Sequence, residues 1–366
     1  MSSLRLRLVL QVTLTLLVSW GAALLCEWAR TPIPWMIGPL LATAAGSLMG
    51  WPTRSSNLLR NGGQWVIGTS LGLYFTAQVG ALVVSLWWAI LVGIVWALAL
   101  GFLFGAWLHR QHAAVLQGVD GHSAQSVRAT SYFAGAIGGA SEMTLLAERA
   151  GARTDLVAAA HSLRLLLVVI LLPFGMQWFQ AHWDLHVNAS LLPGPRVAHW
   201  PEVLWLFAAT GAGACVMLLL KRTNPWFMGP MLMSMALTLS GVEWSAVPTP
   251  MSNAAQLIIG VSLGVRFERN FIHAAPRWMV SVALGTLAMM AASVALGWGM
   301  AWATGLHPAT LILGTAPGGI AEMAITAKVL ELGVPVVTAF QVCRLVAVLM
   351  IVAPLYKWIE TPAEAQ

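Results

Sequence analysis

The chain has 366 residues, of which 58% are hydrophobic and only 9% are charged, and its mean hydropathy is +0.78. A soluble domain cannot bury that much apolar surface, so these values exclude an ordinary soluble protein. The net charge of +6 comes from basic residues scattered between apolar stretches, which argues against a nucleic-acid-binding face and for a role in membrane topology. The three cysteines form no CxxC pair, so neither a disulfide framework nor a zinc site is indicated.

Long apolar stretches recur along the chain, and each can cross a hydrocarbon core of about 30 Å. No alternating strand pattern accompanies them, so they predict an all-α polytopic membrane protein. The first stretch follows Arg5 and Arg7, but it exceeds the apolar region of a signal peptide and no cleavage site follows, so we expect a retained helix. The stretches cover residues 8–26, 81–108, 203–220, 279–304 and 334–355.

An internal duplication organises the chain, because three sequence blocks occur twice in the same order. PWMIGP at 34–39 matches PWFMGP at 225–230, QWVIGTSLG at 64–72 matches QLIIGVSLG at 256–264, and GGASEM at 138–143 matches GGIAEM at 318–323. A polar stretch with Pro193, Gly194 and Pro195 separates the copies. The predicted domains are a first membrane repeat over 1–179, an external linker over 180–200, a second membrane repeat over 201–358 and a short cytoplasmic tail over 359–366.

Each copy predicts about five spans and one glycine-broken region. In the second copy, residues 308–315 are apolar, Ala316-Pro317-Gly318-Gly319 interrupts them, and a helical pattern resumes over 320–332. At membrane depth, two short helices joined by such a break predict a re-entrant hairpin or a discontinuous helix. The first copy lacks the proline, since Ile137 stands where the second has Pro317, so the two half-sites are expected to be unequal.

The distribution of basic residues predicts the orientation. With both termini cytoplasmic, only Arg30 and Arg196 fall in external segments, and the second copy begins on the opposite face from the first. We therefore predict repeats of inverted topology in a bacterial inner membrane, as in many secondary transporters. The internal segments carry Arg5, Arg7, Arg54, Arg60, Arg110, Arg128, Arg149, Arg153, Lys221, Arg222, Arg266, Arg269, Arg277 and Lys357.

Charged residues inside the membrane are costly, so each needs a partner or a water-filled cavity. In both copies an arginine follows the glutamate of the repeated block by 22 residues, and the midpoint falls in a predicted turn. Two antiparallel helices would then place Glu and Arg at the same depth, about 16 Å from the turn and near the midplane. Each pair is either a neutralised ion pair or part of a binding site. The candidate substrate-binding residues are Glu142, Glu322, Arg164, Arg344, Gly138, Gly139, Thr315, Pro317, Gly318, Gly319, His161 and Gln341.

The glycines before each glutamate favour the binding site, because they free backbone amides at a helix N-terminus where an anionic group can dock. The glutamate could instead carry a coupling proton or help to hold a cation. Lys328, six residues after Glu322, is expected to extend its ammonium group to the membrane surface, and the alternative is a third charge of the site. His109 and His112 are expected to be solvated in a cytoplasmic loop, and the metal-like pair His182 and His186 lacks a third ligand.

The paired GGxxEM blocks and the repeated WxxGP motif resemble the AbrB-duplication family of bacterial inner-membrane proteins, over roughly residues 31–356. Members of that family are labelled ammonia monooxygenases or membrane regulators of gene expression, and they are distinct from the small soluble DNA-binding AbrB fold. The resemblance implies a membrane protein that looks like secondary transporters with inverted repeats.

The favoured hypothesis is a secondary transporter of a small solute, with alternating access by relative motion of helix bundles. A ligand-sensing membrane protein that regulates gene expression indirectly is the second. An ammonia monooxygenase is the third, although it would need clustered metal ligands and only His161 is placed inside a span. We expect no enzyme activity, metal or cofactor. The expected partners are membrane lipids, a small-molecule ligand and a coupling ion, without nucleic acid, and the sequence leaves a homo-oligomer open.

Overall fold

The computed structural model describes residues 2–120, 123–182, 197–242, 244–267 and 276–360, and in these it contains fifteen α-helices and no strand. The prediction of an all-α membrane protein is confirmed. Most of the predicted linker and tail, 183–196 and 361–366, lies outside the described residues. Six of the described helices are long and apolar enough to cross a membrane, namely α1 (Ser2–Trp28), α5 (Trp87–Asp120), α8 (Thr154–His182), α9 (Glu202–Leu219), α13 (Pro276–Thr304) and α16 (Val334–Glu360).

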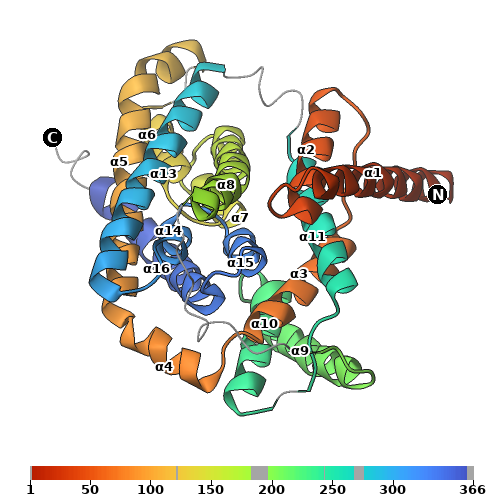
Figure 1. The fold of residues 1–366 in the computed structure, drawn as a ribbon. Helices are drawn as coiled ribbons and strands as arrows, with labels where there is room; N and C mark the ends of the chain where they lie inside the picture. Colours follow the sequence, from red (N-terminus) through yellow and green to blue (C-terminus); the bar gives the residue numbers. More distant parts are fainter. Residues whose placement is uncertain (1, 121–122, 183–196, 243, 268–275, 361–366) are drawn as a thin grey trace. The chain divides into compact units, whose positions relative to one another are not determined.

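The helices form two compact units (Figure 1). Unit 1 takes its described residues from Met1–Ser85, Leu172–Asn270 and Ala324–Pro335, and unit 2 from Leu86–Leu171, Phe271–Met323 and Val336–Gln366. Both units therefore contain segments of both sequence copies. Helices of one copy are completed by helices of the other within the same unit.

Unit 1 contains four short helices that pack in exchanged pairs, α3 on α10 and α2 on α11 (Figure 1). A Cβ atom on Gly68 of α3 would collide with the carbonyl oxygen of Phe227 in α10, and one on Gly260 of α11 would lie 2.5 Å from the carbonyl oxygen of Met36 in α2. Glycine therefore allows close backbone contact at matching positions of the two copies. The bounds of these helices are Pro34–Leu48 for α2, Asn57–Gly72 for α3, Pro225–Leu239 for α10 and Thr249–Gly264 for α11.

The repeated Pro-Trp block starts a helix in each copy. Pro34 and Pro225 occupy the first turns of α2 and α10, where a missing amide hydrogen costs nothing because no intrahelical acceptor is available there. The residues before them, Ile33 and Asn224, both adopt left-handed backbone conformations with φ of 48° and 50°. The same local geometry thus precedes the block in both copies.

The third helix of the first copy, α3, is followed by a sharp bend that the sequence does not mark. After α3, the chain bends by 87° and forms the short helix α4 (Ala77–Ser85). The pair has the combined length and hydropathy of one membrane span, but the bend makes it a broken span or a re-entrant segment.

Unit 2 contains the long helices α5 and α13, which pack antiparallel. His112, near the C-terminal end of α5, forms a 2.8 Å hydrogen bond with Ser281 near the start of α13, and Phe104 further back in α5 contacts Gly285 further along α13. The expectation that His112 is solvated is therefore wrong, since it is only 8% exposed. The helix extends past it because residues 109–117 contain neither proline nor glycine to end it.

The predicted glycine-broken regions are present in both copies. In the second copy α14 (Pro308–Thr315) ends where expected and α15 (Ile320–Val329) resumes after four residues. In the first copy α6 (Ala124–Gly135) and α7 (Ala140–Arg149) flank a break of the same length. The residues that follow α6 and α14, Ala136 and Ala316, are extended, with ψ of 137° and 146°. Each break therefore exposes the carbonyl end of one half-helix and the amide end of another.

Candidate ligand-binding site

The candidate site comprises the two helix breaks of unit 2 and the side chains that contact them from α8 and α16. The last carbonyl groups of a helix have no amide donor within that helix, and in a membrane they cannot obtain one from lipid. Breaking a helix in the middle of a unit therefore requires other donors. The structure supplies them from the residues that the sequence had singled out.

His161 and Arg164 of α8 satisfy the carbonyl groups at the end of α6. The His161 Nε2 atom lies 2.9 Å from the Phe133 carbonyl oxygen, and Arg164 donates from Nη2 to the Ala136 carbonyl oxygen at 2.8 Å. Arg164 also donates from Nη1 to Gly135 at 3.3 Å and from Nη2 to His161 Nδ1 at 2.5 Å. Both side chains are buried, with 3% exposure each.

Gln341 and Arg344 of α16 act in the same way on the second break. Gln341 donates from Nε2 to the Leu313 carbonyl oxygen at 2.8 Å and to that of Ala316 at 3.2 Å. Arg344 donates to the carbonyl oxygen of Ala316 at 2.5 Å and to that of Gly318 at 2.6 Å. Gln341 is fully buried and Arg344 is 5% exposed.

The two half-sites correspond residue by residue, because adding 180 to a number in the first gives its equivalent in the second. His161 corresponds to Gln341 and Arg164 to Arg344, and their acceptors Phe133 and Leu313 also correspond. The sequence duplication is thus repeated as a set of equivalent contacts. The histidine is replaced by glutamine in the second half-site, which alters the hydrogen bonding within it.

Both glutamates bend back over the glycine at the start of their own helix. A Cβ atom on Gly139 would collide with the Glu142 carboxylate, and one on Gly319 with the Glu322 carboxylate. Each glutamate is the third residue of its short helix, the position from which a carboxylate reaches the unpaired amide of the residue before the helix. Each carboxylate therefore stabilises the positive end of its helix.

In the part of the chain that the structure describes, the two arginines form neither of the predicted Glu–Arg ion pairs, which corrects the sequence interpretation. Among the described residues, the guanidinium groups of Arg164 and Arg344 bond to backbone carbonyls, with His161 as a further partner of the first. The arginines lie where a helix C-terminus lacks donors, and the glutamates lie where a helix N-terminus lacks acceptors. Each of these side chains thus satisfies unpaired backbone groups at one end of a short helix.

The remaining predicted residues form the walls of the two breaks. Gly138 and Gly318 allow the side chains of Met143 and Met323 to pack against the backbone, since a Cβ atom there would lie 2.7 and 2.8 Å from them. Pro317 lies in the second break. Thr315 bonds to backbone oxygens of Leu311 and Ser293, so its hydroxyl serves helix packing.

Arg164 and Arg344 bring two positive charges into one buried region. Both side chains belong to unit 2 and are buried, with 3% and 5% exposure. Neither guanidinium has a carboxylate partner among the described residues, although a helix C-terminus offers each about half a negative charge. The polar groups of both half-sites therefore belong to unit 2.

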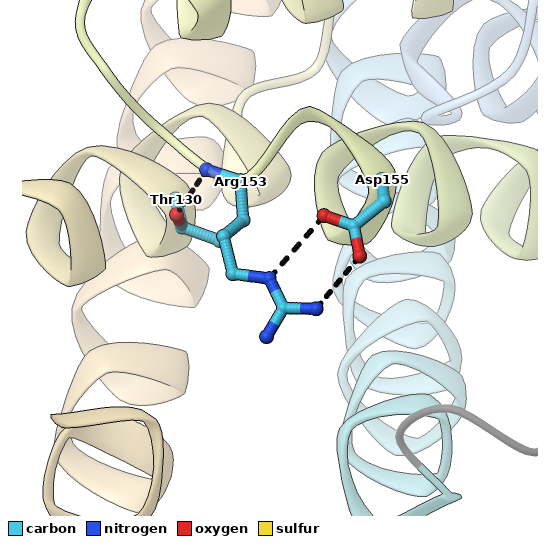
Figure 2. A network of polar contacts seen from close by, with 3 residues as sticks. All are labelled: Thr130, Arg153 and Asp155. Carbon is cyan, nitrogen blue, oxygen red and sulfur yellow. Dashed lines mark hydrogen bonds and ion pairs between the residues drawn. The ribbon is translucent and has the colours of Figure 1, made fainter. Parts of the chain in front are cut away.

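The turn between α7 and α8 carries an ordinary surface ion pair (Figure 2). Arg153 donates from Nη2 to Asp155 Oδ2 at 2.8 Å and from Nε to Oδ1 at 3.3 Å. The backbone amide of Arg153 donates to the Thr130 hydroxyl at 2.9 Å, which ties the turn to α6. As predicted, residue 153 lies in the turn that precedes the helix with Arg164, and Gly333 lies in the equivalent turn before α16.

Lys328 is a polar residue whose environment the sequence did not reveal. Its ammonium group donates to the hydroxyls of Ser70 in α3 at 2.6 Å and Ser252 in α11 at 3.2 Å, all within unit 1. The expectation that it extends to the membrane surface is therefore wrong, because both serines are only 4% exposed. Its equivalent in the first copy is Glu148, so no sequence symmetry marked it.

Metal ligands do not gather in the part of the chain that the structure describes, where no three His, Cys, Asp or Glu residues could hold an ion together. His182 packs on the ring of Trp178 and bonds to its backbone oxygen. The other histidine of the metal-like pair, His186, lies outside the described residues.

Comparison with known families places this architecture. The model of the family described as "Transition state regulatory protein AbrB" matches residues 35–360, which is nearly the whole chain. The chain belongs to the AbrB family. The resemblance inferred from the GGxxEM and WxxGP motifs is therefore confirmed, and the family match extends over both breaks and the four side chains of α8 and α16 that contact them.

This AbrB-family protein is similar in sequence to two described bacterial proteins. "Uncharacterized protein YhjN" of Bacillus subtilis is 25% identical over 308 residues, which cover 81% of this chain and 77% of the relative. "Putative regulator AbrB" of Escherichia coli is 26% identical over 231 residues, which cover 62% of this chain and 64% of the relative, less than two thirds of its length. Neither description names an enzyme.

Proposed function

We propose that this AbrB-family membrane protein is a secondary transporter of a small solute, which it binds at the two helix breaks of unit 2. The observation that supports this proposal is the pair of broken helices held open by buried arginines. Discontinuous helices place backbone ends, and the polar side chains that bind them, at membrane depth, where an intact helix would place neither.

The proposal also explains why the breaks are stabilised so extensively. Two continuous helices would satisfy their own backbone groups. A break that served no function could therefore be replaced by continuous helix without losing hydrogen bonds. Here four buried polar side chains, His161, Arg164, Gln341 and Arg344, are needed to satisfy the carbonyl groups that the breaks expose. Ionisable residues buried at membrane depth are costly, and they are characteristic of solute and ion pathways.

Transport would use the two units as its moving parts. Each unit is compact, and the candidate site belongs wholly to unit 2. We propose that unit 2 carries the bound solute while moving relative to unit 1, which gives alternating access. Glu142 and Glu322, at the amide ends of the breaks, are the candidates for carrying a coupling proton or helping to hold a cation.

A second candidate is a membrane sensor that binds its ligand at the same breaks and does not move it. The description of the Escherichia coli relative as a regulator favours this alternative. Such a sensor would act on gene expression through a partner, because binding at a buried site changes only the surfaces that the helices present. Flux measurement separates the two functions.

The experiment is a screen of small anions, amines and amino acids for thermal stabilisation of the purified protein in detergent. A ligand at 100 times its Kd stabilises the folded state by about 2.7 kcal/mol. We expect hits for the wild type that are lost in Glu142→Gln and Glu322→Gln and kept in Glu148→Gln, a matched control on the exposed side of α7.

Hits are then tested for uptake into proteoliposomes. Uptake of a stabilising solute supports transport, whereas binding without uptake supports the sensor. If every hit stabilises the wild type and both glutamate variants equally, ligands bind elsewhere and the proposed site is wrong.

A further inference from the structure

The two half-sites differ in whether their polar atoms are satisfied. In the first, His161 Nε2 pairs with the Phe133 carbonyl oxygen and therefore carries the hydrogen, which leaves Nδ1 to accept from Arg164. In the second, the side-chain hydrogen bonds of Gln341 all use its amide nitrogen, and its Oε1 atom has no hydrogen-bond partner. The Nε atom of Arg344 is also buried without a partner.

The two unpartnered atoms have complementary needs. Arg344 Nε carries a hydrogen that requires an acceptor, and its charge favours an anionic oxygen. Gln341 Oε1 requires a donor. The residues are three apart on α16, so they are neighbours on one face of the helix, separated by about 5 to 6 Å at their Cβ atoms.

We propose that the second half-site binds short carboxylates that carry a hydroxyl or amino group on the adjacent carbon. The carboxylate accepts from Arg344 Nε, and the neighbouring hydroxyl or ammonium group donates to Gln341 Oε1. This inference rests on the proposed function and specifies its solute class. A group bound at these two atoms breaks no hydrogen bond within the protein.

The first half-site cannot take such a ligand in the same way. His161 already accepts the hydrogen bond from Arg164, so an incoming ligand would have to displace a contact that the protein makes for itself. The two half-sites otherwise match. The replacement of histidine by glutamine at one equivalent position therefore gives them different ligand specificities. It accompanies the exchange of Ile137 for Pro317 in the breaks themselves.

The first test needs no variant. Thermal stabilisation of the wild-type protein is measured with lactate and with propionate, which have the same charge and differ by the hydroxyl group alone. We expect lactate to bind at least about tenfold more tightly, because a site built to hydrogen-bond a hydroxyl discriminates strongly against its absence. Equal binding of the two would overturn the inference.

The second test interconverts the half-sites. Gln341→His gives α16 the side chain that satisfies Arg164 in α8, so we expect this variant to fold and to lose its preference for lactate. His161→Gln is the reciprocal control, and we expect it to keep the preference. Melting temperatures without ligand verify that both variants are folded.

The outcomes separate this inference from the proposed function. If other solutes are bound and taken up while lactate and propionate behave alike, the transporter proposal survives and the assignment of hydroxy- or amino-carboxylates as its solutes is wrong. If Gln341→His keeps the wild-type preference, the second half-site does not set it. If no solute of any class is bound or taken up, both proposals fail.

Discussion

At the scale of single residues, the buried arginines stabilise the ends of the broken helices. Arg164 and Arg344 each satisfy carbonyl groups that no backbone amide can reach. We predict that Arg164→Gln and Arg344→Gln each lower the free energy of unfolding by about 3 kcal/mol, because a buried charge-assisted network is lost and its acceptors are left unsatisfied. Thermal or denaturant unfolding of the purified protein in detergent measures the change.

Arg153→Gln is the matched control for this prediction. Arg153 also forms a hydrogen-bonded contact, with Asp155 (Figure 2). The bond is 2.8 Å long, but the two side chains are 25% and 58% exposed. Exposed ion pairs contribute about 0 to 1 kcal/mol, so we expect little change in stability. Equal losses in all three variants would show that the buried arginines do not stabilise the breaks in particular.

The sequence predicted which residues gather at the breaks but not how they pair. Counting residues from the turn gave the depth of Glu142 and Arg164, yet depth alone does not fix the direction in which a side chain points. The unsatisfied backbone groups at the two ends of a broken helix determine that direction. Unpaired carbonyl groups at a helix C-terminus attract the arginines, and unpaired amide groups at a helix N-terminus attract the glutamates, which is the arrangement in the structure.

At the scale of helices, glycine determines how closely the exchanged pairs of unit 1 pack. Gly68 and Gly260 face backbone oxygens of Phe227 and Met36. We predict that Gly68→Ala and Gly260→Ala each destabilise the protein by about 1 to 3 kcal/mol, because the added methyl group forces the helices apart. The melting temperature of each variant, compared with the wild type, measures the effect.

Gly62→Ala serves as the control within the same helix. No atom lies within 4 Å of a Cβ atom at Gly62, and alanine is the better helix former by about 0.5 to 1 kcal/mol. The variant should therefore be as stable as the wild type or more so. A loss at Gly62 equal to that at Gly68 would mean that packing against α10 is not the cause.

The helix bounds at the second break were predictable to the residue, because Pro308, Pro317 and paired glycines punctuate an apolar sequence, although α15 ends at Val329, three residues earlier than predicted. The sharp bend between α3 and α4 was not, since residues 73–76 contain no proline or glycine that would mark it. Nor was the continuation of α5 through His112. That segment is polar by composition, and its burial against α13 depends on contacts 169 residues away in sequence.

At the scale of the whole molecule, the duplication was visible in the sequence but the interleaving of the copies was not. Matching blocks show that two segments have the same local structure, and they carry no information on which copy each helix packs against. The exchanged pairs α3 with α10 and α2 with α11 follow from long-range packing alone. Lys328 illustrates the consequence, because its partners come from both copies.

The inverted orientation of the copies stays a prediction, and the packing of α5 against α13 supports it. These are the equivalent long helices of the two copies. Residues later in α5 contact residues earlier in α13, so the two helices are antiparallel. The 29 residues of α13 span about 44 Å, which is long enough to place its two ends at opposite faces of a membrane. The end of α5 near Asp120 should then lie opposite Leu306, which follows α13.

Reporter fusions after Asp120 and after Leu306 test this orientation. We expect a cytoplasmic reporter to be active at Asp120, where basic residues flank the segment, and an external reporter to be active at Leu306. A fusion after Lys357 is the control for the cytoplasmic side. Fusions at Asp120 and Leu306 that report the same side would contradict the inverted repeat, and alternating access would then need a basis other than the exchange of two equivalent halves.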